Sequence, residues 1–453
     1  MFMDFNFLLE KYKNKKIGFV GVGVSNTPIA RLFCSNGIAV TIRDLKPLEQ
    51  KLADEFIALG ASIITGEHYL ESIDEDMLFL SPAIKRFPEL LEAANRGVIL
   101  TGELPEFFSF CPCKRICVTG SDGKTTTTTL IAKILEAEGY NVYLGGNIGK
   151  NLFMELPNIQ KDGFAVVEIS SFQLQKLKVK PDVAIVTNVS PNHLDWHTDM
   201  DEYVDSKKRI FEFQTAENKL VLNLDNDITK GFAEQTVSKV AFFSRKNPDC
   251  RFFADGKSIY VDGKAVIDDD SIILPGTHNH ENLMAAMAAT EDYSSYESMR
   301  SVAASFGGVE HRNEFVRELD GVRYYNSSID SSPTRTKAAI ESFKCKLVVI
   351  AGGYDKNIPV DILGEVFKKH TRAAVLMGNT ANKLEKMLNE YGYTEPIARA
   401  TDMHDAVHKA RALAKNGDCV ILSPAAASFD LFKNFAERGN IYKDEVNKLT
   451  SEL

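Results

Sequence analysis

Seven consecutive residues have the types and spacing of a phosphate-binding loop. They follow an apolar strand at 115–119 and open a helical pattern: Gly120, Ser121, Asp122, Gly123, Lys124, Thr125 and Thr126. Glycines let the backbone turn tightly, so that successive N–H groups face an anion. Lys124 is placed to bridge the β- and γ-phosphates of ATP, and the Thr125 hydroxyl is placed to hold Mg²⁺. Asp122, an acid inside an anion-binding loop, is expected to point to solvent.

Three residues further along the chain have side chains that suit a metal site beside this loop. Glu168 ends the apolar strand FAVVE, and a carboxylate at the carboxyl edge of a sheet faces the nucleotide crevice. It would bind Mg²⁺ there or pair with a nearby lysine. His193 follows VAIVTNVSPN, and its type alone also allows a helix cap or a core histidine. Lys207, in S-K-K-R-I-F, is by type alone a solvated helix lysine.

A second glycine turn, G-V-G-V-S-N at 21–26, allows a competing interpretation as a dinucleotide site. Asp44 ends the next strand about twenty residues later, as the dinucleotide fingerprint requires. Asn26, however, replaces the third glycine of that fingerprint. A plain dehydrogenase also leaves the loop at 120–126 unexplained.

The elements that position these residues are strands that break into glycine. Such strands occur at 15–26, 114–126 and 345–356, and each opens a βα unit of a parallel sheet. The segment 242–274 differs, because short alternating strands with turns at 255–256 and 262–263 predict a small antiparallel addition. We expect an α/β protein of three domains, with an N-terminal Rossmann-like domain at 1–108, a central mononucleotide-binding domain at 109–308 and a C-terminal Rossmann-like domain at 309–453.

Composition limits the classes of function. A chain of 453 residues exceeds one hydrophobic core. A net charge of −9 disfavours a nucleic-acid partner, although a local pocket for a small anion remains possible. No apolar run is long enough for a membrane helix, and the N-terminal segment lacks the pattern of a signal peptide, so we expect a cytoplasmic protein without membrane insertion.

Several motifs together resemble those of the Mur ligase family, which also includes folylpolyglutamate synthase. The similarity runs over the whole chain in the same order: T-G-S-D-G-K-T-T at 119–126, G-G-N-I-G at 145–149, E-I-S-S-F-Q-L at 168–174, N-H-L-D-W-H at 192–197, G-T-H-N-H-E-N at 276–282, E-H-R at 310–312 and S-P-A-A-A-S-F-D-L-F-K-N-F-A-E-R-G at 423–439. The last motif looks most like the member that adds D-glutamate. The resemblance implies an ATP-dependent ligase, expected to be a monomer, that joins D-glutamate to UDP-N-acetylmuramoyl-L-alanine.

The resemblance also assigns roles around the nucleotide. It implies that Thr125 and Glu168 hold one Mg²⁺ ion, that His193 binds a second, and that Lys207 is carbamylated to an anion near it. Carbamylation requires a neutral amine, which nearby metal ions would favour. The family match places Asn279 and Asn282 near the purine and lets Arg312 reach the nucleotide.

Two further groups of residues match substrate positions of the family. On the UDP-sugar side they are Val24, Ser25, Asp44, Leu45, Lys46, Ser81 and Asn147. Around D-glutamate they are Ser331, Lys356, Ser428, Phe429 and Phe435. The aromatic pair is equally compatible with a core position.

One segment departs from the family pattern. Where the family commonly has N-D-S-K-A-T-N, this chain has N-S-S-I-D-S-S at 326–332. Ser327 stands for the usual Asp and Ile329 for the usual Lys, while Asp330 adds an acid. The departure puts the local contacts in doubt and, to a lesser degree, the acceptor amino acid.

Two rival functions remain open. Folylpolyglutamate synthase would lack the diphosphate-binding first domain that this chain is expected to have. A binding protein that uses ATP only as a switch would need no amino-acid pocket and would tolerate replacement of Lys207.

Overall fold

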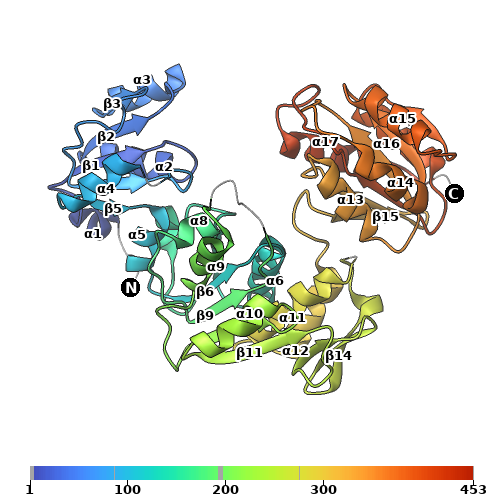
Figure 1. Cartoon of the computed structure of the whole chain (residues 1–453), viewed down its shortest axis with the longest axis horizontal. Helices are drawn as coiled ribbons and strands as arrows, with labels where there is room; N and C mark the ends of the chain where they lie inside the picture. Colours follow the sequence, from blue (N-terminus) through green and yellow to red (C-terminus); the bar gives the residue numbers. More distant parts are fainter. Residues whose placement is uncertain (1–4, 86, 192–196, 275, 452–453) are drawn as a thin grey trace. The chain divides into compact units, whose positions relative to one another are not determined.

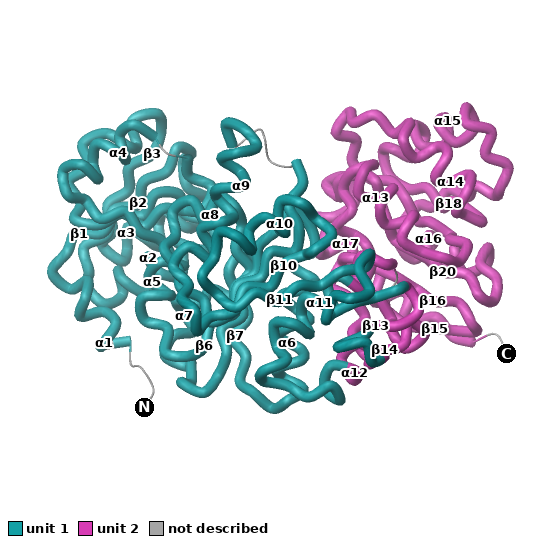
Figure 2. Tube along the Cα trace, turned by 60° about the horizontal axis from the view of Figure 1, so that its bottom comes forward, with its two compact units in different colours: residues 1–255, 260–264, 281–299 teal, residues 256–259, 265–280, 300–453 magenta. Residues whose placement is uncertain are grey.

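The strands of this chain form three sheets in chain order (Figure 1). The structure, a computed structural model, describes residues 5–85, 87–191, 197–274 and 276–451. By compactness the chain divides into two units (Figure 2). Unit 1 comprises 1–255, 260–264 and 281–299, and unit 2 comprises 256–259, 265–280 and 300–453. The division into three domains at 108 and 308 remains a prediction.

The first sheet is a five-stranded parallel sheet of the order β3-β2-β1-β4-β5. Its strands are β1 (Lys16–Val20), β2 (Ala39–Asp44), β3 (Ser62–Thr65), β4 (Met77–Leu80) and β5 (Ile99–Thr101). The helices of this region are α1 (Phe5–Glu10), α2 (Asn26–Ser35), α3 (Gln50–Ala58), α4 (Pro88–Asn95) and α5 (Glu103–Phe110). Because the strand order reverses at β1, a crevice is expected outside the carboxyl ends of β1 and β4.

The central sheet has nine strands in the order β14-β13-β12-β11-β10-β9-β6-β8-β7. They are β6 (Lys114–Thr119), β7 (Val142–Gly146), β8 (Phe164–Glu168), β9 (Val183–Val186), β10 (Lys219–Asn223), β11 (Lys239–Ser244), β12 (Phe252–Ala254), β13 (Ser258–Val261) and β14 (Lys264–Asp268). Its helices are α6 (Lys124–Ala137), α7 (Leu152–Glu155), α8 (Ser171–Leu174), α9 (Met200–Lys208), α10 (Asp227–Gly231), α11 (His278–Thr290) and α12 (Tyr296–Ser305), with 3₁₀ turns η1 (Leu156–Asn158), η2 (Phe232–Gln235) and η3 (Asp269–Ser271).

The short strands predicted over 242–274 are continuous with this central sheet. β12 pairs with β11 in parallel. β13 and β14 are joined by Asp262 and Gly263, which both have positive φ angles of 49° and 73°. Two such residues form the tight turn that suits a hairpin, so the added strands extend the sheet at its edge.

The third sheet has the order β15-β16-β20-β17-β18-β19, in which β15 alone runs antiparallel to its neighbour. Its strands are β15 (Glu314–Leu319), β16 (Val322–Asn326), β17 (Leu347–Gly352), β18 (Thr371–Met377), β19 (Ile397–Arg399) and β20 (Cys419–Leu422). Its helices are α13 (Pro333–Glu341), α14 (Gly364–His370), α15 (Ala381–Glu390), α16 (Met403–Leu413) and α17 (Phe435–Lys448), with η4 at Asp361–Leu363. Every residue of β17 and β20 is buried, as expected of strands covered on both faces.

A continuous core explains why the first two sheets form one compact unit. Tyr12 and Phe33, from the first region, pack on Phe153 of α7 with ring centroids 6.5 and 6.3 Å apart. The same buried cluster continues into β6, β8 and β9. Among the residues that the structure describes, no helix is both long and apolar enough to cross a membrane.

Candidate active site

The three glycine turns predicted from the sequence all follow the carboxyl ends of strands. Gly21 follows β1, Gly120 follows β6, and Gly353 follows β17. Parallel sheets bind ligands outside these ends, where the strand order reverses. The fold therefore provides one candidate site at each sheet.

The phosphate loop between β6 and α6 is tied to the end of the neighbouring strand β9. The Thr187 hydroxyl donates to the Asp122 carbonyl at 2.6 Å, and the Asp122 N–H donates to Asn188 Oδ1 at 3.0 Å. The Asp122 side chain is exposed, as the sequence predicts. Gly123 has a φ of +78°, and a Cβ there would lie 2.3 Å from Asn282 Oδ1. This close approach and the left-handed backbone both require glycine at 123.

Two lysine side chains share one carbonyl of this loop. Lys124 Nζ lies 2.9 Å from the carbonyl oxygens of Gly120 and Ser121, and Lys207 Nζ lies 2.8 Å from that of Gly120. Lys207 is only 1% exposed, so it is not the solvated helix lysine that its residue type suggests. Burial, followed by the charge of Lys124, holds the pKa of Lys207 well below its ordinary value. A neutral amine is therefore favoured beside the phosphate loop.

Tyr203 connects Lys207 to the phosphate loop. Its ring lies 4.5 Å from Lys207 Nζ, and its hydroxyl lies 2.9 Å from Ser121 Oγ. Both Tyr203 and Ser121 are buried. Because Tyr203 stands one helical turn before Lys207 on α9, it fixes the lysine and the loop relative to each other.

Glu168, at the end of β8, has the features of a metal ligand. Its carboxylate is 1% exposed, and Oε1 accepts from the Asn147 amide at 2.8 Å. Among the residues that the structure describes, Oε2 is buried without a hydrogen-bond partner. A buried carboxylate oxygen that lacks a donor is costly unless a cation binds it. Together with Thr125 in the first turn of α6, these groups fit a Mg²⁺ ion. His193 lies outside the described residues.

Asn147 contacts Glu168 twice, which suggests a role beyond the one predicted from the sequence. Its backbone N–H donates to the Glu168 carbonyl, and its amide donates to Oε1, both at 2.8 Å. We expect Asn147→Ala to raise the Mg²⁺ concentration for half-maximal activity by about 10- to 100-fold, because the orienting hydrogen bond is lost. A rate–Mg²⁺ titration measures this change, with Asn141→Ala as control, since Asn141 is exposed and its amide donates to Gln160. A change confined to the KM of the UDP-sugar would instead support the predicted muramoyl contact.

The two purine residues predicted from the sequence, Asn279 and Asn282, lie in the first turns of the same helix, α11. Asn282 of α11 is buried against the phosphate loop, where Thr127 Oγ1 donates to its Oδ1 at 3.3 Å. Asn279 is buried in the first turn of α11. Asn279 and Arg312 belong to unit 2, whereas Asn282 belongs to unit 1.

The predicted UDP-sugar residues gather at the carboxyl edge of the first sheet. Val24 and Ser25 precede α2, Asp44 ends β2 with Leu45 and Lys46 after it, and Ser81 follows β4. Asn26 is fully buried, and its amide donates to the carbonyls of Gly21 at 2.8 Å and Phe79 at 3.1 Å. Asn26, which replaces the third glycine of the dinucleotide fingerprint, therefore links the carboxyl ends of β1 and β4 by hydrogen bonds. Val24 is 92% exposed, and with Ser25 it leaves the start of α2 open to an anion.

The predicted amino-acid residues of unit 2 are only partly brought together. Ser331 and Lys356 line one pocket with Tyr354, Thr380 and Ala425–Ala427. Ser428 follows this wall and is buried, and the exposed Phe429 ring lies 6.3 Å from that of Tyr354. Phe435 instead packs on His311, with ring centroids 5.8 Å apart. Lys356 is the one basic residue among the described residues that line this pocket.

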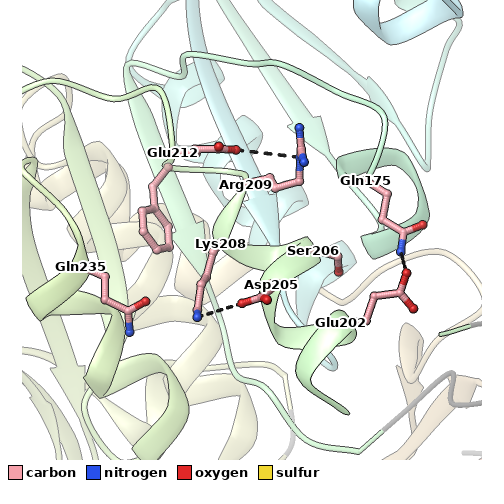
Figure 3. A pocket seen from close by; sticks show the side chains of 9 residues that line it. Gln175, Glu202, Asp205, Ser206, Lys208, Arg209, Glu212 and Gln235 are labelled. Atoms are coloured by element: carbon pink, nitrogen blue, oxygen red, sulfur yellow. Dashed lines mark hydrogen bonds and ion pairs between the residues drawn. The ribbon is translucent and has the colours of Figure 1, made fainter. Parts of the chain in front are cut away.

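Another hollow lies beside α9 (Figure 3). It measures about 500 Å³, and Lys207 is not among the residues that line it. Lys208 pairs with Asp205 and Arg209 with Glu212, while the neutral Gln175 amide donates to Glu202. Three carboxylates against two cations give the lining a net charge of −1, which disfavours an anionic substrate.

Comparison with known families agrees with this geometry. The profile of the Mur ligase middle domain matches residues 118–290, and that of the Mur ligase glutamate ligase domain matches residues 311–426. The chain belongs to the Mur ligase family. The phosphate loop and all described lining residues of the unit 2 pocket except Ala427 lie within the matched ranges.

Curated relatives of this Mur ligase match almost its whole length. It is 46% identical to UDP-N-acetylmuramoylalanine–D-glutamate ligase of Acetivibrio thermocellus, over 97% of this chain and 98% of the relative. It is 42% identical to the enzyme of that name from Clostridium perfringens, over 98% and 99%. The solved UDP-N-acetylmuramate–alanine ligase of Thermotoga maritima shares the fold, with a TM-score of 0.60 at 17% identity over 96% and 99%.

Sequence reasoning missed several residues that support the sites of this Mur ligase. Tyr203, Thr187 and Asn188 hold the phosphate loop, and Arg438 and Asp330 tie the loops of unit 2 together. The four-residue spacing from Tyr203 to Lys207 is a signal that a helix places both on one face. Nothing local distinguishes Arg438 from a surface helix arginine.

Proposed function

We propose that this chain is an ATP-dependent ligase that joins D-glutamate to UDP-N-acetylmuramoyl-L-alanine in peptidoglycan synthesis. Members of its family use ATP and Mg²⁺. Two structural observations support the proposal. The buried Lys207 amine donates to the phosphate loop, and Glu168 Oε2 is buried without a hydrogen-bond partner among the described residues. The two substrates follow from the names of relatives that match nearly the full chain.

The proposed reaction has two steps. The alanine carboxylate attacks the γ-phosphorus of ATP, the bond to the β–γ bridging oxygen breaks, and an acyl phosphate and ADP form. The amine of D-glutamate then attacks the acyl carbon, loses a proton, and phosphate leaves with the electron pair of the broken C–O bond. Phosphorylation is required because a carboxylate itself is a poor electrophile.

The residues of the phosphate loop supply positioning and positive charge for the first step. The N–H groups of 120–125 surround the β-phosphate, and Lys124 exchanges its two carbonyl contacts for the γ-phosphate. Gly120, Ser121, Asp122, Gly123 and Thr126 shape this loop, Asn279 and Asn282 approach the purine, and Arg312 approaches the phosphates. Mg²⁺, when bound, neutralises charge between two anions that otherwise repel. Thr125 and Glu168 hold one ion, and His193 and Lys207 lie near a second.

Lys207 is proposed to act as a carbamate. Its neutral amine adds to CO₂, forming an N–C bond and releasing one proton, so that a buried neutral amine becomes an anion. The supporting observations are its 1% exposure and its lowered pKa. A ¹³C resonance of the carbamate after incubation with labelled bicarbonate, absent from Lys207→Met, tests the modification without any activity assay.

The substrates occupy the other two edges. Val24, Ser25, Asp44, Leu45, Lys46 and Ser81 bind the UDP part, and Asn147 lies toward the muramoyl part. Lys356, Ser331 and Ser428 bind the carboxylates of D-glutamate, flanked by Phe429 and Phe435. We further propose that the protein is a cytoplasmic monomer with domains at 1–108, 109–308 and 309–453.

The decisive experiment measures ATP-dependent phosphate release with UDP-N-acetylmuramoyl-L-alanine and one amino acid at a time. D-glutamate, L-glutamate, L-lysine, meso-diaminopimelate and L-alanine are compared, with Lys124→Ala as control. Release only with D-glutamate, lost in the control, supports the proposal. Release with another amino acid keeps the ligase but reassigns the acceptor. ATP binding without release in any well favours a nucleotide switch.

A further inference from the structure

Asp330 is a buried acid that none of the steps above uses. It lies in the turn between β16 and α13 and is 6% exposed. Its Oδ2 accepts from the Ser423 hydroxyl at 2.9 Å, and the Ser327 side chain also hydrogen-bonds to its carboxylate. Burial raises the pKa of Asp330, and these hydrogen bonds oppose that rise. A buried carboxylate with two hydroxyl donors is a built feature and not a surface charge.

The carboxylate joins three segments of unit 2. Ser327 Oγ accepts from the Asn313 N–H at 3.2 Å, and Asn313 directly follows Arg312. Ser423 begins the loop after β20, and its hydroxyl lies 3.0 Å from that of Thr336, which accepts from the Ala425 N–H at 3.0 Å. Asp330 itself precedes Ser331. The linker with Arg312, the turn with Ser331 and the loop toward Ser428 therefore meet at one side chain.

Positive charges surround this junction. Arg438 is 1% exposed and donates to Ser328 Oγ and O at 3.0 and 2.8 Å and to the carbonyls of Ala426 and Ala427 at 3.1 Å. Burial lowers the pKa of Arg438 to about 10, and the charges of Asp430 and Asp330 oppose this. Arg312 and Arg335 also act on Asp330. A negative charge at Asp330 thus offsets a guanidinium that clamps the wall of the amino-acid pocket.

We propose that Asp330 is the positioning residue of the amino-acid pocket, because its carboxylate holds the linker with Arg312, the turn with Ser331 and the loop toward Ser428 together. The inference rests on the proposed function, since the pocket is assigned to D-glutamate. The Ser327 hydroxyl carries no charge, and it hydrogen-bonds to the Asp330 carboxylate.

The first test is Asp330→Ala. We expect kcat/KM for D-glutamate to fall by about 100-fold, because a misplaced pocket wall loses productive geometry. The KM for UDP-N-acetylmuramoyl-L-alanine should stay within about twofold, because the residues proposed to bind it belong to unit 1 and Asp330 contacts none of them in the described structure. Ser332→Ala is the matched control, since Ser332 caps α13 without a side-chain hydrogen bond. Unchanged D-glutamate kinetics in Asp330→Ala would overturn the inference.

The second test moves the carboxylate to position 327, whose side chain already hydrogen-bonds to Asp330. Ser327→Asp combined with Asp330→Ala keeps one buried acid at the junction and should recover D-glutamate kinetics to within about tenfold of the unmodified protein. A purely structural need for the Asp330 hydrogen bonds would not be met by an acid at another position. A double variant as impaired as Asp330→Ala, folded or not, overturns the inference. Failure of the unmodified protein to use D-glutamate in this assay would contradict the proposed function instead.

Discussion

Replacing Lys207 by Met is expected to abolish ligation and to stabilise the protein at the same time. Phosphate release with both substrates should fall by about 10³-fold, as when a preorganised electrostatic group is removed from an active site. The free energy of unfolding of the ligand-free protein should rise by about 1–3 kcal/mol, because a buried amine beside a second cation is replaced by an apolar side chain. If Lys207 were retained only for stability, its replacement by Met would lower the free energy of unfolding.

The lowered pKa of Lys207 determines how the stability difference between the unmodified protein and the Met variant changes with pH. The pKa of Lys207 is lower in the folded state than the unfolded value of about 10.4, so the unfolded state binds the proton more tightly. In the unmodified protein, the free energy of unfolding therefore increases as pH rises from the folded-state pKa of Lys207 to its unfolded-state pKa. The Met variant lacks this dependence, so its additional free energy of unfolding should be largest at low pH and should decrease as pH rises.

Denaturant unfolding at several pH values, together with the phosphate-release assay, checks both effects. Lys208→Met is the matched control, because the neighbouring Lys208 is partly exposed and paired with Asp205. We expect this control to change stability by less than about 0.5 kcal/mol. Wild-type turnover in Lys207→Met would remove the carbamate from the mechanism.

Replacing Glu168 by Gln is expected to have the second largest effect. Glutamine has the shape of glutamate and keeps the contact with Asn147, but the charge of the carboxylate is lost. The oxygen Oε2 has no hydrogen-bond partner among the described residues. We expect the maximal rate to fall by about 10²- to 10³-fold and the Mg²⁺ requirement to rise, because the cation loses its carboxylate ligand.

Two measurements separate this loss of metal binding from a general defect. A Mg²⁺ titration of activity shows the changed requirement. Thermal unfolding with ADP, with and without Mg²⁺, shows the lost metal-dependent stabilisation directly. Glu155→Gln serves as control, since Glu155 of α7 lies 3.7 Å from Lys150 on the surface. Unchanged Mg²⁺-dependent stabilisation in Glu168→Gln would show that Glu168 is not a ligand.

The parts of the site set by local backbone chemistry were predictable from the sequence. A strand followed by a glycine turn and a helical pattern predicts a βα unit, and all three such glycine turns lie at the carboxyl ends of strands. The short strands after 242 and their turns were also predictable, because Asp-Gly pairs favour positive φ. Their continuity with the central sheet was not, since strand neighbours depend on long-range pairing.

The parts set by tertiary burial could not be predicted. Lys207 has the sequence context of a solvated helix lysine, and its burial depends on the loop 87 residues earlier in the chain. Asp330 reads as a departure from the family pattern, and its role depends on Ser423, 93 residues later. Asn147 matched a substrate position, yet its amide contacts Glu168. His193 falls outside the described residues, so its metal role remains a prediction.

The shared Gly120 carbonyl has a practical consequence. One carbonyl oxygen accepts from the amino groups of both Lys124 and Lys207, so a tetrahedral dianion that binds the loop N–H groups draws the Lys124 ammonium away from an oxygen that Lys207 also uses. Sulfate or inorganic phosphate in an assay buffer will therefore compete with ATP more strongly than chloride at equal ionic strength. The released product is itself such a dianion, so turnover should slow as phosphate accumulates, and a coupled system that consumes phosphate will report the faster, intrinsic rate.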